Sequence, residues 1–399
     1  MAAPSVAVVG AGAAGLVAAG FAAAGGAAVT LIERTKDGGR KILISGGGRC
    51  NVLPSVLAPE RFVSDSPVHL LRGMLRAWPL HEQHAFFERD LGIPLALEEE
   101  SGKLFPKSDR ARDIRDALVE FARTKGARLH FNTTVTGVVP SASGFRLETS
   151  SGNVDCTRVV LATGGLSVPA TGSDGIGLRI AATLGHQLND TYPALTPLLD
   201  DTGRHAALSG ISLNVRLRSK SVETHGGFLF THRGYSGPSV LDISHVTSRP
   251  AEAFGEGGPI RVQWASLGPE ELTGKDEFLT SILSRKIPSR LAEQLLHECS
   301  IPLDRRTSSL TREERHTLIE AMTSYALPWS GNEGYKKAEV TGGGVALTEV
   351  NPKTLESRKV KGLYLCGEML DAFGPIGGHN FSWAWSTGRA AGMAAGSAP

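Results

Sequence analysis

The chain has 399 residues, of which 41% are hydrophobic and 21% charged, and its formal net charge is +2. This is the composition of an ordinary globular protein, long enough for two or three domains. So small a net charge produces no field that would collect nucleic acid or acidic membranes, and neither is an expected partner. Four widely separated cysteines without metal-ligand spacing favour the reducing cytoplasm and predict neither disulfides nor a metal site.

Residues 6–33 carry the strongest signal. An apolar strand at 6–9 is followed by Gly10-x-Gly12-x-x-Gly15, an alanine-rich helix to residue 24, and a second apolar strand at 28–32. This order is the dinucleotide-binding fingerprint, in which the glycines allow a tight turn, close approach of a pyrophosphate and close helix packing. The helix N-terminus then offers free N–H groups to the phosphates. The expected cofactor contacts here are Gly10, Gly12, Ala13, Ala14, Gly15, Glu33 and Arg34.

Glu33 follows Gly15 by 18 residues, where a carboxylate accepts hydrogen bonds from a ribose. An acid at this point favours FAD or NAD over a 2′-phosphorylated cofactor. The alternative is a tight turn in an ordinary parallel sheet. Residues 5–32 are uncharged, but glycine and alanine dominate them and no basic segment precedes them, so we expect neither a membrane span nor a signal peptide.

The segment Ile44-Ser45-Gly46-Gly47-Gly48-Arg49-Cys50-Asn51 is the second glycine-rich stretch. Three successive glycines let the backbone lie against a flat ligand. Arg49 adds a positive charge that suits a pyrophosphate or a reduced, anionic flavin. Cys50 is either a thiol beside a redox ring or a small buried side chain that only packs. The expected cofactor contacts are Lys41, Gly47, Gly48, Arg49, Cys50 and Asn51, with Arg49 and Cys50 also candidate catalytic residues.

In the middle of the chain the spacing of the apolar residues changes. Residues 159–165 predict a buried parallel strand, and its exit, Ala162-Thr163-Gly164, is either a second cofactor contact or an ordinary strand end. From about residue 193 the apolar residues alternate with period two, which predicts a β-barrel or sandwich domain over 193–268 and 329–349. Helical spacing over 269–328 predicts a small helical insert in it.

The C-terminal segment is expected to complete the first domain. Residues 362–368 predict a strand that ends on Gly367 and Glu368, and a glycine-rich loop leads into a helix over 382–395. The start of that helix is placed to stabilise a reduced flavin. Trp383 and Trp385 are expected to pack in the core. The fold class is therefore α/β: a doubly wound, Rossmann-like FAD-binding domain built from both termini, residues 1–192 and 350–399, with the β-barrel domain inserted. Contacts expected here are Gly367, Glu368, Gly377, Gly378, His379, Asn380 and Phe381.

The motifs ISGGGRCN and GLYLCGE…GPIGGHN resemble the aminoacetone oxidase-like or BaiN-like family of bacterial flavoproteins, the NAD(P)/FAD-dependent oxidoreductases. The resemblance covers most of the chain. It implies that Val135 lies near adenine, that Glu368 lies near the ribityl or pyrophosphate region, and that the segment 229–238, with its candidate catalytic residue His232, matches an FTH-x-G-x-SGP motif. The chain departs from the family in having Leu53-Pro54 after the first motif and His379 where tyrosine is usual.

These observations predict a cytoplasmic, FAD-dependent oxidoreductase acting on a small organic substrate, by amine oxidation or enone reduction. Because only one fingerprint is evident, NAD(P)H is expected at most as a transient electron donor. The catalytic residue stays open among Arg49, Cys50, His232 and His379. The alternatives are a flavin-bearing binding or regulatory protein, for instance an RNA-associated one, and a Rossmann-type NAD enzyme without flavin.

Overall fold

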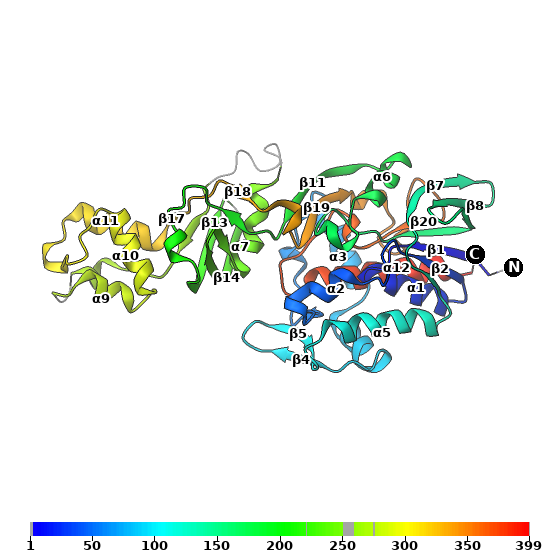
Figure 1. Cartoon of the computed structure of the whole chain (residues 1–399), viewed down its shortest axis with the longest axis horizontal. Coiled ribbons are helices and arrows are strands. Elements are labelled where there is room, and N and C mark those ends of the chain that lie inside the picture. The colour runs from blue at the N-terminus through cyan, green and yellow to red at the C-terminus, as the bar shows by residue number, and fades with distance from the viewer. Residues whose placement is uncertain (1–2, 221, 250–258, 274–275, 399) are drawn as a thin grey trace. The chain divides into compact units, whose positions relative to one another are not determined.

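The computed structural model describes residues 3–220, 222–249, 259–273 and 276–398, which form two compact units. Unit 1 contains residues 1–193 and 339–399, and unit 2 contains residues 194–338. The chain returns to unit 1 at Glu339, earlier than the expected residue 350, because strand β19 (Val340–Val345) pairs there with β11 (Leu188–Ala194). Unit 1 is thus built from both ends of the chain, which lie near each other in Figure 1.

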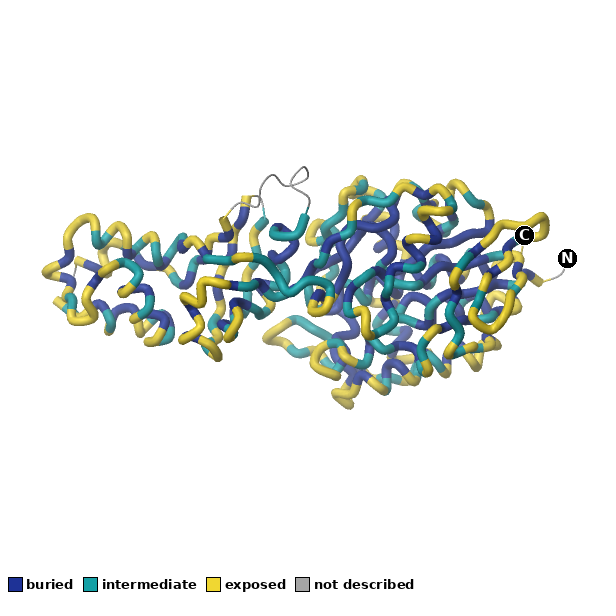
Figure 2. The backbone as a smooth tube through the Cα atoms, turned by 45° about the horizontal axis from the view of Figure 1, so that its top comes forward, coloured by how far each residue is buried: buried dark blue, intermediate teal, exposed yellow. Residues whose placement is uncertain are grey.

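A five-stranded parallel sheet forms the centre of unit 1. Its strand order is β20-β10-β1-β2-β6, and every pairing in it is parallel. The strands are β1 (Ser5–Val9), β2 (Ala28–Ile32), β6 (Arg128–His130), β10 (Arg158–Leu161) and β20 (Leu363–Leu365). The inner strands β1, β2 and β10 consist mainly of buried Val, Leu, Ile and Ala, with Ser5, Thr30 and Arg158 as their polar residues, as expected of a parallel sheet covered on both sides (Figure 2). This sheet confirms the predicted α/β class.

Helices and smaller sheets complete unit 1. Its helices are α1 (Ala13–Ala24), α2 (Arg40–Ile44), α3 (Val68–Arg76), α4 (Leu80–Ala85), α5 (Ala111–Thr124), α6 (Ile176–Thr183) and α12 (His379–Gly396). Two three-stranded sheets join β3 (Leu53–Pro54), β5 (Lys103–Pro106) and β4 (Leu95–Glu98), and β7 (Val135–Ser141), β8 (Gly144–Thr149) and β9 (Val154–Cys156). Strand β6 ends at His130 and β7 begins at Val135, and between them Asn132 takes a left-handed backbone conformation with φ of 54°.

The first and last long helices pack against each other almost backbone to backbone. Gly388, Gly392 and Gly396 of α12 face Ala14, Ala18 and Ala22 of α1, and a Cβ on any of these glycines would overlap a carbonyl oxygen of α1. Both sets repeat every four residues, so each forms one stripe along its helix. In Figure 1 the red α12 accordingly lies beside the blue α1. This contact joins the two ends of the chain.

Unit 2 is built on a seven-stranded antiparallel sheet with the order β17-β16-β13-β14-β15-β12-β18. The strands are β12 (Leu198–Leu199), β13 (Ser212–Ser219), β14 (Val222–Thr231), β15 (Gly234–Ser236), β16 (Arg261–Gln263), β17 (Tyr325–Ala326) and β18 (Gly331–Asn332). In the described pairings β17 and β18 are the two edges, so the sheet does not close into the β-barrel that was one of the two expected forms. Helices of this unit are α7 (Pro238–Ile243), α9 (Leu279–Ser284), α10 (Ser289–Glu298) and α11 (Arg312–Thr323).

The α1–α12 contact predicts a sharp difference between two glycines. Gly392→Ala should lower the free energy of unfolding by about 1–3 kcal/mol, because the added methyl group has no space against Ala18. The control Gly73→Ala, on the exposed face of α3 with no atom nearby, should raise it by about 0.5–1 kcal/mol. Urea denaturation followed by circular dichroism measures both. Equal effects of the two substitutions would show that the stripe is not tightly packed.

Candidate functional site

The turn after β1 has the geometry that the fingerprint requires. Gly10 has a φ of 100°, and a Cβ on it would lie 2.6 Å from the carbonyl oxygen of Ala162. A Cβ on Gly15 would overlap the Gly10 carbonyl, whereas one on Gly12 would meet nothing within 4 Å. The outer two glycines are therefore required by the protein's own packing. The middle glycine borders free space at the start of α1.

The N-terminus of α1 is left open for an anion. Gly12 is its N-cap residue and supplies no side-chain cap, and no acidic residue lies in the first turn, which begins Ala13-Ala14-Gly15. The first N–H groups of a helix have no partner within the helix and carry its positive dipole end. Free space at Gly12 and free donors at the helix start together suit a phosphate group.

Glu33 is buried at the end of β2, with 9% of its surface exposed. Its two carboxylate oxygens accept hydrogen bonds from the backbone N–H groups of Ala11 and Thr35, both at 2.7 Å. Glu33 thus holds the fingerprint turn in place, and a carboxylate with about four acceptor sites keeps capacity for a ribose hydroxyl. Its neighbour Arg34 forms an ion pair with Asp174.

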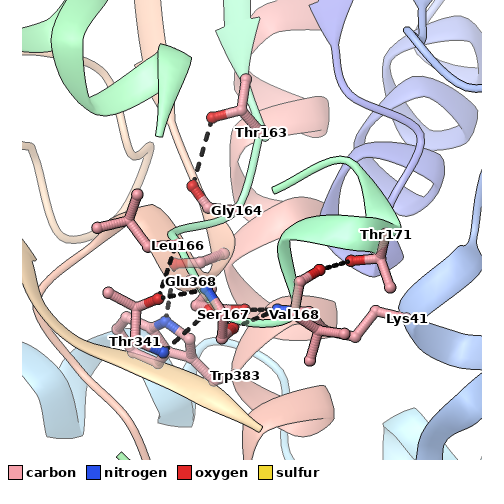
Figure 3. Close-up of polar contacts among 11 residues, drawn as sticks. Lys41, Thr163, Gly164, Leu166, Ser167, Val168, Thr171, Thr341, Glu368 and Trp383 are labelled. Carbon is pink, nitrogen blue, oxygen red and sulfur yellow. Dashed lines mark hydrogen bonds and ion pairs between the residues drawn. The ribbon is translucent and has the colours of Figure 1, made fainter. Parts of the chain in front are cut away.

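A polar cluster connects α2 with the turn that follows β20 (Figure 3). The Lys41 ammonium group donates to Glu368 and to the Ser167 hydroxyl, both at 2.6 Å. Ser167 in turn donates to the other carboxylate oxygen of Glu368, which also accepts from the Thr341 N–H at 3.0 Å. The Thr341 hydroxyl accepts from the N–H groups of Leu166 and Ser167. Two residues predicted from sequence, Lys41 and Glu368, are therefore in direct contact.

The loop 45–51 is shaped by left-handed backbone conformations. Gly46, Gly47, Gly48 and Cys50 all have φ between 55° and 89°. The Arg49 guanidinium lies 3.9 Å above the Phe105 ring centroid and pairs with Glu98 and Asp109, so its charge already has partners within the protein. This differs from the free positive group expected at the flavin, and Arg49 instead fastens the loop to β4, β5 and the start of α5.

Cys50 is fully buried, and burial raises the pKa of its thiol to about 12. A thiol with that pKa stays protonated at neutral pH and is a poor nucleophile. This geometry favours the packing role over the redox role for Cys50. The next residue, Asn51, is also buried, and its side-chain oxygen Oδ1 has no hydrogen-bond partner in the described part of the chain. Such an unpaired acceptor is costly unless a ligand or water satisfies it.

The loop before α12 is held by Asn380. Its side chain exchanges hydrogen bonds with the backbone N–H and carbonyl of Gly374, both at 2.9 Å, and Gly377 and Gly378 have positive φ. His379 is buried, and burial lowers the pKa of its imidazole to about 4, with a smaller contribution from Arg61. The imidazole is therefore neutral at pH 7. The positive end at this loop comes from α12, which begins at His379, three residues earlier than expected.

The remaining predicted residues are distributed as follows. Ala162, Thr163 and Gly164 follow β10 directly, and Ala162 and Thr163 lie beside Gly10 of the fingerprint turn. Val135 is buried at the start of β7 and pairs with Thr149. Gly367 donates its N–H to Thr387, and Phe381 stacks on Trp385 with ring centroids 5.2 Å apart. His232 lies exposed in unit 2, at the turn between β14 and β15. Trp383 and Trp385 are buried, as core packing requires.

Sequence reasoning missed Ser167 and Thr341, which bind Glu368, and Asp371. The Asp371 carboxylate is buried and accepts hydrogen bonds from Ser64, Asp65, Ser66 and Asn189. A signal was available for Ser167, which follows the end of a central strand, and for Thr341, which precedes three glycines. Asp371 had none, because its partners come from distant parts of the sequence.

The residues present fit FAD. An added Cβ on Gly12 or Gly47 would touch nothing within 4 Å, and Gly12 lies at the open N-terminus of α1. Asn51 Oδ1 has no hydrogen-bond partner among the described residues. Glu33 would hold the adenosine ribose and the start of α1 the pyrophosphate. Lys41, Glu368 and the α12 loop come from the far ends of the chain, as a long cofactor requires.

Comparison with known proteins agrees with this geometry. A family model described as HI0933-like protein Rossmann domain matches residues 4–394. The ribosomal RNA dihydrouridine synthase of Escherichia coli is 34% identical over 389 residues, covering 95% of each chain. The 3-dehydro-bile acid delta(4,6)-reductase of Clostridium scindens is 31% identical over 418 residues, covering 99% of each chain.

Solved structures share the fold at lower identity. A 3-ketosteroid-delta4-(5alpha)-dehydrogenase from Rhodococcus jostii has a TM-score of 0.51 at 17% identity, covering 99% of this chain and 97% of that one. A flavocytochrome c3 fumarate reductase has a TM-score of 0.50 at 17% identity, covering 98% and 78%. Within the described residues, no helix is both long and apolar enough to cross a bilayer. The chain belongs to the HI0933-like family of Rossmann-fold, FAD-dependent oxidoreductases.

Proposed function

We propose that this protein is an FAD-dependent reductase that adds a hydride and a proton across a carbon–carbon double bond conjugated to a carbonyl group. The proposal rests on one observation: the names of the two kinds of relative describe the same type of reaction. Making dihydrouridine means reducing the 5,6 double bond of uracil, which is conjugated to the 4-carbonyl. A delta(4,6)-reductase of a 3-dehydro bile acid reduces double bonds conjugated to the 3-ketone.

A conjugated carbonyl makes this reduction possible because it draws electron density from the double bond. The β-carbon then accepts a hydride, and the α-carbon afterwards takes a proton. FAD, when bound, supplies the hydride. The protein would bind and orient the cofactor: the α1 N-terminus would hold the pyrophosphate, Glu33 would hold the ribose, and the loops at 45–51 and 374–378 would border the other end. Amine oxidation, which the sequence left open, finds no support among these two relatives.

Uracil within RNA is the favoured substrate. Dihydrouridine synthases of two organisms, at 34% and 33% identity, match this chain over 95–96% of its length. The low net charge had argued against nucleic acid, but net charge describes only the summed field and not a local site. A small, enone-containing molecule is the second candidate, since the bile acid reductase matches 99% of the chain. NADH or NADPH is proposed as the transient electron donor.

The cofactor assignment is tested by Gly12→Val. Because no protein atom lies within 4 Å of a Cβ at this position, the variant should fold normally, yet its side chain would fill the space proposed for the pyrophosphate. We expect the wild-type protein to purify yellow with FAD, and Gly12→Val to lose at least nine-tenths of it. Absorbance at the flavin band, with circular dichroism as the folding check, measures this. Gly73→Val, an exposed control, should keep FAD; full FAD content in Gly12→Val would refute the assignment.

The reaction is tested by anaerobic mixing of the dithionite-reduced protein, after removal of excess dithionite, with two substrates. An unmodified ribosomal RNA transcript should reoxidise the flavin and gain two hydrogen atoms at uridine, seen by mass spectrometry of its nucleosides. A 4-en-3-one steroid tests the second candidate. If neither substrate reoxidises the flavin while an amine reduces the oxidised protein, the enzyme is an oxidase and the proposal is wrong.

A further inference from the structure

His205 is a buried histidine of unit 2 that takes no part in the candidate flavin site. It directly precedes a short 3₁₀ turn (Ala206–Leu208), and only 2% of its surface is exposed. Both of its ring nitrogens have partners: Nδ1 lies 2.8 Å from the Tyr235 hydroxyl, and Nε2 lies 3.0 Å from Glu298 Oε1. What these partners can donate and accept therefore determines which ring nitrogens carry hydrogen.

The contacts of His205 belong to a chain of four polar groups. The Tyr235 hydroxyl also lies 3.1 Å from Asp200 Oδ2, so the chain runs from Asp200 through Tyr235 and His205 to Glu298. Each of the three contacts in this chain needs one hydrogen atom between its two heavy atoms. A phenol and a neutral imidazole together supply two hydrogens, and carboxylates supply none. The chain therefore holds one proton more than these four groups contain.

The imidazole ring is the favoured place for the extra proton. The two carboxylates are the alternatives, and an imidazole binds a proton more tightly than a carboxylate does. The Asp200 carboxylate also accepts hydrogen bonds from the N–H and the hydroxyl of Thr202, which suits its ionised form. If the ring of His205 donates from Nδ1 to the Tyr235 oxygen and from Nε2 to Glu298, every contact has its hydrogen. The ring is then an imidazolium ion.

The surroundings of Glu298 favour a positive ring beside it. Glu298 is the last residue of α10, where the helix dipole disfavours a negative charge. Its carboxylate accepts hydrogen bonds from the Gln294 amide and the Tyr325 hydroxyl, both at 2.7 Å, in addition to the imidazole ring. Burial opposes ionisation, but the hydrogen bonds from His205, Gln294 and Tyr325 lower the pKa of Glu298 to about 2. Glu298 is therefore an anion, and a neighbouring cation offsets the cost of burying it.

The charges of the cluster then cancel. The Arg204 guanidinium lies 3.9 Å from the Glu298 carboxylate, so Arg204 and the imidazolium of His205 together balance Glu298 and Asp200. Water reaches one side of this cluster. An open surface recess borders it, lined by Arg204, Gln294, His297 and Glu298. The extra proton can therefore exchange with the solvent.

We propose that this proton makes unit 2 a pH-sensitive joint, in which the imidazolium of His205 fastens the end of α10 to the sheet. The chain of contacts spans three elements, since Asp200 follows β12, Tyr235 lies in β15 and Glu298 ends α10. When alkaline pH removes the proton, one of the three contacts is left with two acceptors and no hydrogen. Two lone pairs that face each other without water repel, so the joint between α10 and the sheet loosens.

Nitrogen NMR of the full-length protein with ¹⁵N-labelled histidine tests for the extra proton directly. At about pH 7.5, where an ordinary histidine is mostly neutral, both ring nitrogens of His205 should resonate as N–H nitrogens. A neutral ring has one N–H nitrogen and one bare nitrogen, whose chemical shifts differ widely. His205→Gln identifies the signal by its loss, and His316→Gln, at an exposed position of α11, should leave it unchanged. A bare nitrogen in the ring of His205 at this pH would overturn the proposal.

The pH dependence of folding gives a second readout. The proton is bound in the folded protein but, above about pH 6.5, is mostly absent from an unfolded histidine. Above that pH the wild-type folding constant, measured by urea denaturation, should fall up to about tenfold per pH unit more steeply than that of His205→Gln, until the folded cluster releases its proton. His316→Gln should keep the wild-type slope. Equal slopes in wild type and His205→Gln would also overturn the proposal.

Tyr235→Phe tests the chain without removing the histidine. It keeps the aromatic ring but takes away the oxygen that accepts from Nδ1, so the imidazolium of His205 loses one of its two acceptors. Its second N–H signal should therefore disappear at a lower pH than in wild type. The same titration in both proteins would contradict the chain of contacts. This comparison and the wild-type spectrum decide the question even if His205→Gln does not fold.

Discussion

The close contact between α1 and α12 is the constraint on which the site depends. Three glycines of α12 at four-residue spacing let its backbone rest on three alanines of α1. The start of α1, which follows the fingerprint turn, and the start of α12, which follows the Gly377–Gly378 loop, therefore lie within one compact unit. Larger side chains would separate the helices and with them the two halves of the site. Glycine is less favourable than alanine in the interior of a helix. The three glycines of α12 are therefore explained by the close approach of α12 to α1.

The polar groups of the site are divided between those that hold the protein and those available to ligands. Glu33, Arg49, Asn380 and Asp371 are used mainly within the protein, where each fastens a turn or a loop. The α1 N-terminus has no side-chain cap, and Asn51 Oδ1 has no hydrogen-bond partner among the described residues. A preorganised site needs both kinds, since the first kind fixes the positions of the second.

Much of the fold could be predicted from sequence because its signals are local. The fingerprint turn, the apolar run that became β10 and the glycine-rich C-terminal motifs all indicate their structure within a few residues. The surroundings of other predicted residues depend on distant parts of the chain. Arg49 has a positive charge in any context, but Glu98 and Asp109, which neutralise it, come from elsewhere in the chain. His379 is neutral because it is buried, and the residues next to it in the sequence do not indicate that burial.

Hydrogen–deuterium exchange with and without FAD tests most directly that both ends of the chain build one flavin site. The account predicts slower exchange on FAD binding in three separate segments: the fingerprint turn at residues 10–16, the loop at 45–51, and residues 374–383 before and within α12. Protection confined to the first forty residues would contradict it, because the cofactor would then be held by the fingerprint alone.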